Sequence, residues 1–204
     1  MPRTLAALGS VLRKGLDPSH RLGVKEKTAL RDAANSLFPP VGERMAAAFA
    51  KRGVEGVPRV AFDPPFPDTH PYLAALRADL AEILRLEPNL WQGLEIGFYF
   101  GFDATGFRDR LVWGVSGQGD KEWIERCIAL LQRHRRSDEP FLRSGQPLFA
   151  GGAVTRYLIW GWECAPESLP KKKEPALVEE VGSRLANLIE RLLPSRSRAK
   201  SRPR

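Results

Sequence analysis

The chain has 204 residues and a formal net charge of +8, which fits one folded domain with extensions. An apolar content of 43% argues against intrinsic disorder, and no uncharged stretch is long enough for a transmembrane span. Two cysteines, Cys127 and Cys164, are too few for a disulfide framework, which favours a reduced, cytoplasmic protein. The composition is typical of a bacterial protein.

The positive charge lies at the two ends of the chain. Residues 1–30 contribute +4 and residues 166–204 contribute +5, whereas residues 31–165 carry sixteen basic and seventeen acidic residues. A nearly neutral body with cationic ends is typical of a folded domain that partners reach partly through its termini.

Residues 1–51 predict three helices. Apolar residues recur at helical spacing in Thr4–Lys14. Two adjacent prolines, Pro39 and Pro40, are expected to end a second helix, Lys25–Leu37, because proline lacks an N–H donor and clashes with the preceding turn. The alanine-rich segment Val41–Lys51 is predicted to form a third helix, closed by a glycine.

A strand, a loop and a long helix are predicted next. Val57–Phe62 has the composition of a short strand, and the proline-rich segment Asp63–Pro71 indicates a loop. Leucine and isoleucine recur at helical spacing in Tyr72–Leu86, which predicts an amphipathic helix.

The strongest β signal lies in the centre of the chain. Leu94–Phe102 alternates strictly between large apolar residues and smaller or more polar ones, and Arg110–Ser116 is a second strand-like run. Together they predict an antiparallel hairpin. Asp120 can cap a helix over Lys121–His134, and Val154–Trp162 predicts a further strand.

This order of elements predicts an α+β fold, with a small, mainly antiparallel sheet packed by helices. We expect one domain over residues 1–165 and a basic, proline-punctuated linker over residues 166–176. An amphipathic C-terminal helix is expected over residues 177–193, followed by a disordered basic tail over residues 194–204.

The sequence contains no complete motif for a catalytic, metal or cofactor site. The three histidines, His20, His70 and His134, do not pair with another histidine or cysteine at ligand spacing, so no zinc site is predicted. A carboxylate metal site around Glu95, Asp103 and Asp109 stays open, but solvated or turn-forming acids are favoured, so no metal and no cofactor is expected. Ser116–Gly119 resembles a nucleophile turn or a phosphate-binding turn only in part, because the full glycine pattern of either motif is missing. These observations favour a protein that is not an enzyme.

Aromatic and basic residues give the strongest functional indication. Aromatic residues concentrate in the predicted strands, arginines lie near the ends of the same elements, and arginine beside exposed aromatics is typical of a nucleic-acid surface. The C-terminal basic segment would add sequence-independent attraction to phosphates. The residues predicted to bind nucleic acid are Tyr99, Arg108, Arg110, Trp113, Arg156, Arg196, Arg198, Lys200, Arg202 and Arg204. The other arginines near these ends are Arg133, Arg135, Arg136 and Arg143.

One series of segments resembles a known family. Gly56–Phe62, Gln92–Phe100, Asp103 and Arg110–Gly119 are similar to the strand series of the N-terminal DNA-recognition module of McrB-type modification-dependent restriction enzymes. The family has a tryptophan after the proline of the first strand, where this chain has Arg59. The resemblance implies a DNA-binding domain of a defence or restriction system that flips a modified base into an aromatic-lined pocket, and it implies no catalytic residue.

Three functions remain open from the sequence. The leading hypothesis is a non-catalytic module that binds nucleic acid, with DNA favoured over RNA, or that joins a nucleic-acid-associated complex. The second is a protein-interaction subunit that docks through Leu177–Leu193. The third is an enzyme acting on a small substrate in a pocket around Glu95, Tyr99, Trp113 and Arg156. No membrane partner is expected.

Overall fold

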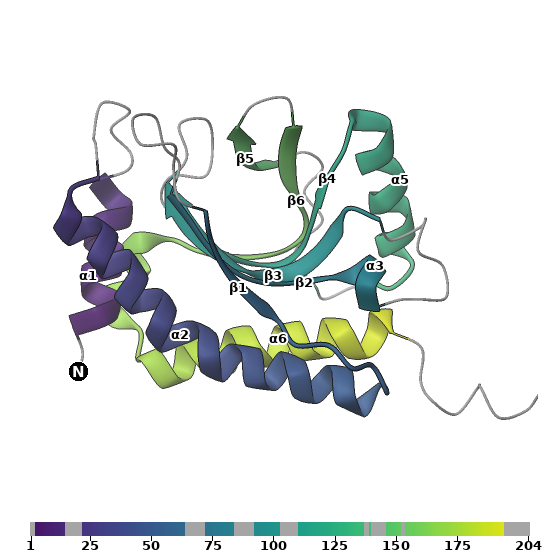
Figure 1. Cartoon of the computed structure of the whole chain (residues 1–204), viewed down its shortest axis with the longest axis horizontal. Helices are drawn as coiled ribbons and strands as arrows, with labels where there is room; N and C mark the ends of the chain where they lie inside the picture. Colours follow the sequence, from purple (N-terminus) through teal and green to yellow (C-terminus); the bar gives the residue numbers. More distant parts are fainter. Residues whose placement is uncertain are drawn as a thin grey trace, which may run out of the picture.

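A six-stranded sheet forms the centre of the molecule, and two long helices lie side by side against one of its faces (Figure 1). The structure is a computed structural model, and it describes residues 3–14, 22–63, 72–83, 92–102, 110–136, 139, 146–151 and 154–193. The basic tail over residues 194–204 and most of the predicted loop Asp63–Pro71 lie outside the described residues.

The sheet confirms the predicted α+β class. Its strand order is β1-β2-β3-β4-β6-β5, and every neighbouring pair is antiparallel. The strands are β1 Arg59–Asp63, β2 Tyr72–Asp79, β3 Leu94–Phe102, β4 Leu111–Gln118, β5 Gln146–Gly151 and β6 Val154–Cys164. The predicted strands over β1, β3, β4 and β6 are confirmed to within two residues at each end, whereas β5 was not predicted.

The two faces of the sheet differ in what covers them. On β3, Leu94, Ile96, Phe98 and Phe100 point into the main core, as the alternating sequence predicts. Helices α2, Val24–Lys51, and α6, Glu174–Leu192, pack against this face. The opposite face carries a small apolar cluster of Ala75, Tyr99, Val112 and Leu158.

The prediction that Pro39 and Pro40 separate two helices is wrong, because α2 runs through both prolines. Phe38 and Val41, on either side of the pair, are buried in the main core, so packing holds the chain helical despite the missing donors. The carbonyls of Asn35 and Ser36 lose their helical partners, but Asn35 is exposed and Ser36 is half-buried, so water can reach them.

The predicted helix Tyr72–Leu86 is also wrong. Residues Tyr72–Asp79 form strand β2, which pairs with β1 on one side and with all but one residue of β3 on the other. Ala74, Leu76 and Ala78 are buried in the main core at strand spacing. Among the described residues, one helical turn follows, α3 over Leu80–Ile83, where the Asp79 carboxylate accepts the Ala81 N–H at 2.8 Å.

The segment predicted as a linker is part of the core. Residues Pro166–Lys171 form a short 3-10 helix that packs against helix α1, Arg3–Lys14, and Leu169 is fully buried. The approach is close: a β-carbon at Gly9 would lie 2.7 Å from the Pro166 carbonyl oxygen. The boundary expected at residue 166 is therefore absent from the described residues.

Helix α6 is amphipathic, as predicted, but its apolar face is already covered. Leu177, Val181, Leu185, Leu188 and Ile189 are each fully buried in the main core. The two long helices run in the same direction (Figure 1), and ion pairs join them at Arg44–Glu179 and at Lys51–Glu190. The apolar face of this helix is therefore not available for the predicted docking of a partner.

Candidate nucleic-acid interface

The two aromatic rings predicted to contact nucleic acid are buried. Tyr99 and Trp113 are each 1% exposed, and they belong to clusters on opposite faces of the sheet. Trp113 packs edge to face on Phe98, with 6.2 Å between the ring centroids. Base stacking needs an accessible ring, so the part of the predicted interface that depends on these two residues is wrong for the structure described.

A row of glycines explains why Tyr99 turns inward. Gly97 of β3 pairs with Gly114 of β4, and Gly114 pairs with Gly161 of β6. A β-carbon at Gly114, where φ is +145°, would lie 2.1 Å from the Trp160 carbonyl oxygen. Only glycine lets the strands approach so closely.

The Tyr99 side chain covers this glycine row. Its hydroxyl oxygen lies 2.8 Å from the position that a β-carbon at Gly97 would occupy. The same hydroxyl forms a hydrogen bond with Ser116 Oγ at 2.9 Å, and Ser116 is fully buried. Tyr99 and Ser116 therefore act as a buried polar pair that closes the second face of the sheet.

The predicted arginines fall into two groups. Arg110 is half-buried and donates to a Glu163 carboxylate oxygen at 2.9 Å, so an acid of β6 already neutralises it. Arg156 lies on β6, opposite Gln118 of β4, and its side chain is outside the described residues. The remaining predicted residues are outside them too: Arg108, Arg196, Arg198, Lys200, Arg202 and Arg204.

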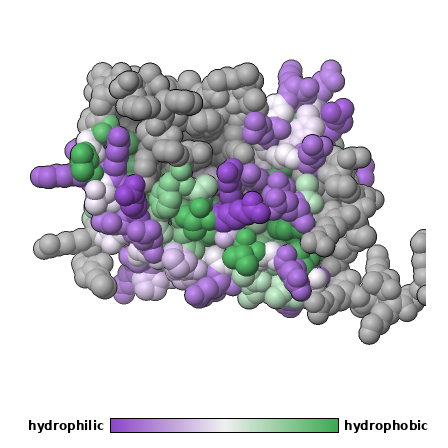
Figure 2. All heavy atoms as spheres, in the orientation of Figure 1, coloured by the Kyte–Doolittle hydropathy of each residue, from purple (hydrophilic) through white to green (hydrophobic). Residues whose placement is uncertain are grey.

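A different set of arginines is exposed on helix α5 and in the residues that follow it. We call Arg126, Arg133, Arg135 and Arg136 the arginine cluster. All four side chains are exposed, and none forms an ion pair with a carboxylate of the described residues. Figure 2 shows hydrophilic residues gathered over helix α5, Lys121–Gln132, at the upper right of that face.

The fold of α5 explains this placement. The Asp120 carboxylate caps the helix by accepting the Trp123 N–H at 2.7 Å. Ile124, Cys127 and Leu131 face the core. Arg126 and Arg133 are seven residues apart, so the helical repeat puts them on one outward-facing side.

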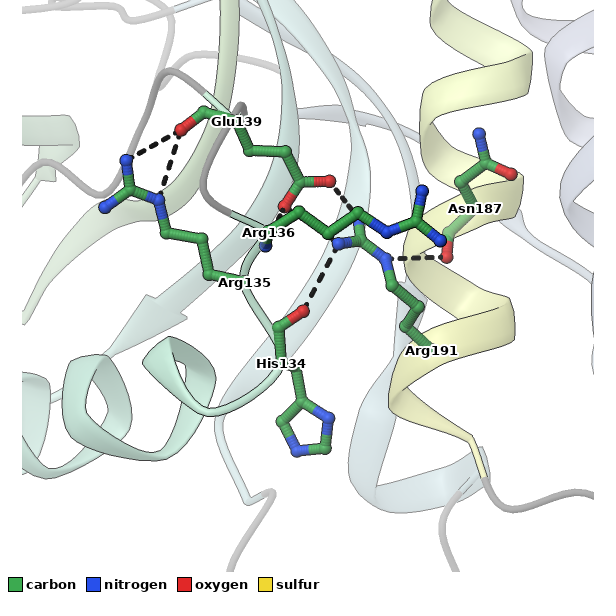
Figure 3. Close-up of polar contacts among 6 residues, drawn as sticks. All are labelled: His134, Arg135, Arg136, Glu139, Asn187 and Arg191. Atoms are coloured by element: carbon green, nitrogen blue, oxygen red, sulfur yellow. Dashed lines mark hydrogen bonds and ion pairs between the residues drawn. The ribbon is translucent and has the colours of Figure 1, made fainter.

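An ion pair anchors the chain that follows α5. The Glu139 carboxylate pairs with Arg191 of α6, and both side chains are largely buried, at 14% and 18% exposed (Figure 3). Arg191 also donates to the His134 carbonyl at 3.2 Å, and its guanidinium lies 5.0 Å from the centroid of the Trp160 ring. These contacts hold the backbone of Arg135 and Arg136 against the end of α6.

The same contacts place Arg135 and Arg136 beside the end of α6. Helix α6 ends at Leu192, one residue after Arg191. Residues 194–204 follow directly and carry five basic residues and no acid. The sequence therefore continues from this corner of the fold with the same sign of charge.

Most other cations on the described elements face an acid. Examples are Lys14 with Glu26 at 2.8 Å and Lys172 with Glu180 at 2.8 Å. Lys25, Lys27 and Arg31 at the start of α2 are a second exposed group, with Glu26 and Asp32 among them. Lys171 and Lys173, before α6, are also exposed. The arginine cluster has four exposed cations and lies beside the end of α6.

A cavity of about 590 Å³ lies at the β1 side of the sheet. Its lining includes four acids, Glu55, Asp79, Glu82 and Glu95, but only two cations, Arg59 and Arg77. This excess of carboxylates disfavours a polyanion. Glu95 lines the cavity and accepts from Arg77 at 3.0 Å, whereas Tyr99 and Trp113 do not line it. The single pocket predicted around all of these residues is therefore not formed.

The described residues show no arrangement typical of a metal or thiol site. They contain no group of three or more potential metal ligands, and no helix among them is long and apolar enough to cross a bilayer. Burial raises the pKa of the Cys127 thiol to about 11, against a partial lowering by Arg126. Burial raises the pKa of Cys164 as well. Protonated, buried thiols are poor nucleophiles and poor ligands.

The sequence contains part of the signal for the arginine cluster. Arg133, Arg135 and Arg136 stand near the end of a predicted helix and next to one another, but the aromatic residues of the strands gave a stronger pattern. Arg126 was missed, although it is seven residues before Arg133 on the same predicted helix. Comparisons with protein-family models, with curated proteins and with solved structures give no match for this chain.

Proposed function

We propose that this protein binds nucleic acid, with DNA favoured over RNA, through the arginine cluster and the basic segment that follows α6. The observation that carries the proposal is the cluster itself: four exposed guanidinium groups without a carboxylate partner among the described residues. Arginine is well suited to phosphate because its planar fork donates two hydrogen bonds at once.

Two further features support this function. Glu139, the described acid that follows Arg136, is neutralised by Arg191, and Glu125, which precedes Arg126, lies 4.0 Å from Lys121, so neither acid is paired with the cluster. The C-terminal segment, which follows α6 in the sequence, adds five positive charges. Contacts of this kind bind the phosphate backbone and carry little sequence information.

Base flipping is not included in this function. A flipped base needs an aromatic-lined pocket, and the two rings predicted to contact nucleic acid, Tyr99 and Trp113, are buried in separate clusters. The expected mode is backbone binding that depends strongly on salt.

The test is binding of a fluorescent DNA duplex of about 30 base pairs, by anisotropy, over a range of salt concentrations. The variant Arg126→Gln/Arg133→Gln/Arg136→Gln should bind about tenfold more weakly or worse. Its slope of log affinity against log salt should fall by up to about 3, because each lost phosphate contact removes roughly 0.9. Arg135 is kept, because its guanidinium bonds the Glu139 carbonyl at 2.7 Å.

The matched control is Lys25→Gln/Lys27→Gln/Arg31→Gln, which removes the same charge from the start of α2. If both triple variants weaken binding equally, net charge and not the arginine cluster is responsible. No binding by the unaltered protein would overturn the function altogether. An RNA duplex of the same sequence, measured in parallel, tests the preference for DNA.

A further inference from the structure

Strand β1 is an edge of the sheet and has exposed apolar residues in it and beside it. All five of its residues pair with β2, and no strand of the described residues pairs with its other side. The described residues include three large, exposed apolar side chains. Two of them lie in β1 or just before it, Val60 at 50% and Val57 at 82% exposed. Figure 2 shows hydrophobic surface over β1, next to strongly hydrophilic residues.

The sequence of β1 is complementary to itself. In an antiparallel pairing with a second β1, centred on Ala61, Arg59 lies opposite Asp63 of the other copy and Val60 lies opposite Phe62. Two-fold symmetry repeats each pair, so one such edge contact contains two pairs of opposite charge and two apolar pairs. We propose that a second copy of this chain pairs with β1 in this register and joins the two sheets edge to edge.

The charges on β1 select this register. Charged residues on an edge strand normally discourage pairing, because like charges meet or because a charge faces an apolar residue. In a two-fold antiparallel pairing, residues opposite each other point to the same face of the sheet. A shift by one residue would break this rule, so the nearest alternative registers shift the opposite residue by two. Those registers place Arg59 or Asp63 opposite Ala61, and only the centred register brings both charges to an opposite partner.

The contacts of Arg59 within the chain leave it able to change partner. Its guanidinium lies 3.4 Å from Glu82, and the two side chains are 78% and 60% exposed. An ion pair this exposed contributes little. On the other face of β1, Phe62 is half-buried against the main core, so the second copy would add its Val60 to an apolar surface that already exists.

This dimer is independent of nucleic-acid binding, because β1 and the arginine cluster share no residue. It is tested by sedimentation velocity of the full chain over a wide range of concentrations. The unaltered protein should shift from 22.8 kDa toward twice that mass as its concentration rises. Arg59→Asp and Asp63→Arg, each alone, should weaken the dimer by about tenfold or more, because each places like charges opposite each other at two positions.

The decisive measurement is a mixture of the two single variants. A chain with Arg59→Asp presents two acids and a chain with Asp63→Arg presents two cations, so an equimolar mixture should form a heterodimer at concentrations where each variant alone is mostly monomeric. The double variant, with both changes in one chain, should dimerise with itself. Arg31→Asp, the same change of charge on α2, should leave the dimer intact.

Three outcomes would overturn the inference. The unaltered chain stays monomeric at every concentration, or the single variants dimerise as it does, or the mixture and the double variant both stay monomeric. Far-ultraviolet circular dichroism of each variant shows whether it is folded. If a single variant unfolds, the double variant decides, since it carries the same charges as the unaltered strand in reversed positions.

Discussion

At the scale of single residues, Gly114 of β4 holds a backbone conformation that other residues rarely adopt. Gly114 combines a φ of +145° with a carbonyl oxygen 2.1 Å from the site of its absent β-carbon. The burial of Tyr99 follows from this, because a row of glycines leaves a hollow that a large ring can fill. A sequence shows the glycines, but not that they stand opposite one another on three strands.

We therefore expect Gly114→Ala to lower the free energy of unfolding by about 3 kcal/mol or more, through strain in the backbone and collision with β6. Gly42→Ala is the matched control. Gly42 lies within helix α2, and its β-carbon would meet Leu76 at an ordinary 3.5 Å. This change should raise stability by about 0.5–1 kcal/mol, because alanine favours the helix. Urea unfolding of both variants tests the pair, and equal effects would contradict it.

Some features of the candidate site could be predicted from the sequence, and others depend on contacts between distant residues. The sequence shows that Arg110 and Glu163 have opposite charges, but only the sheet register brings Val112 opposite Glu163 and so places Arg110 near this acid. Whether an arginine is free or paired depends on such long-range contacts. The arginine cluster could have been inferred, because its members belong to one helix and the residues just after it, and helical spacing is a local property.

At the scale of elements, the predictions were confirmed where the local pattern and the tertiary contacts agree. Strand β3 has the strict alternation of a buried strand, and its bounds match the predicted Leu94–Phe102. Strand β2 is the opposite case. Its leucines and alanines favour a helix locally, but pairing with β1 and β3 on both sides overrides that preference.

Helix α2 tests how local preference and tertiary packing compete. Pro39 is exposed in the middle of the helix, so Pro39→Ala should restore an N–H donor to the Asn35 carbonyl and raise the free energy of unfolding by about 1 kcal/mol. The gain is smaller than the full helix penalty of proline, because alanine also makes the unfolded chain more flexible. Thermal unfolding measures it.

Pro175→Ala is the control for this change. Pro175 lies in the first turn of α6, where proline removes no helical hydrogen bond, so its replacement should not raise stability. A loss of stability in Pro39→Ala would mean that the prolines fix a local bend that the core requires, contrary to the continuous helix described here.

At the scale of the whole molecule, the positive charge is neutralised in some parts of the fold and left uncompensated in others. The ion pairs between α2 and α6 neutralise cations along the helical layer, at Arg44 and Lys51. Uncompensated charge remains at the end of α5 and continues into residues 194–204. A polyanion would therefore be attracted to this corner of the fold, where the exposed arginines lie and α6 ends.

Removing residues 194–204 tests whether that corner acts as one surface. The deletion should weaken DNA binding and lower the salt slope by up to about 4.5, since it removes five basic residues at roughly 0.9 per phosphate contact. The fold should be unchanged, because α6 ends at Leu192, before the deleted segment. A full-length variant with glutamine at the five basic positions separates charge from chain length, and it should behave like the deletion. If the salt slope stays unchanged in both, the C-terminal segment does not contact the phosphates, and the arginine cluster would have to account for the binding alone.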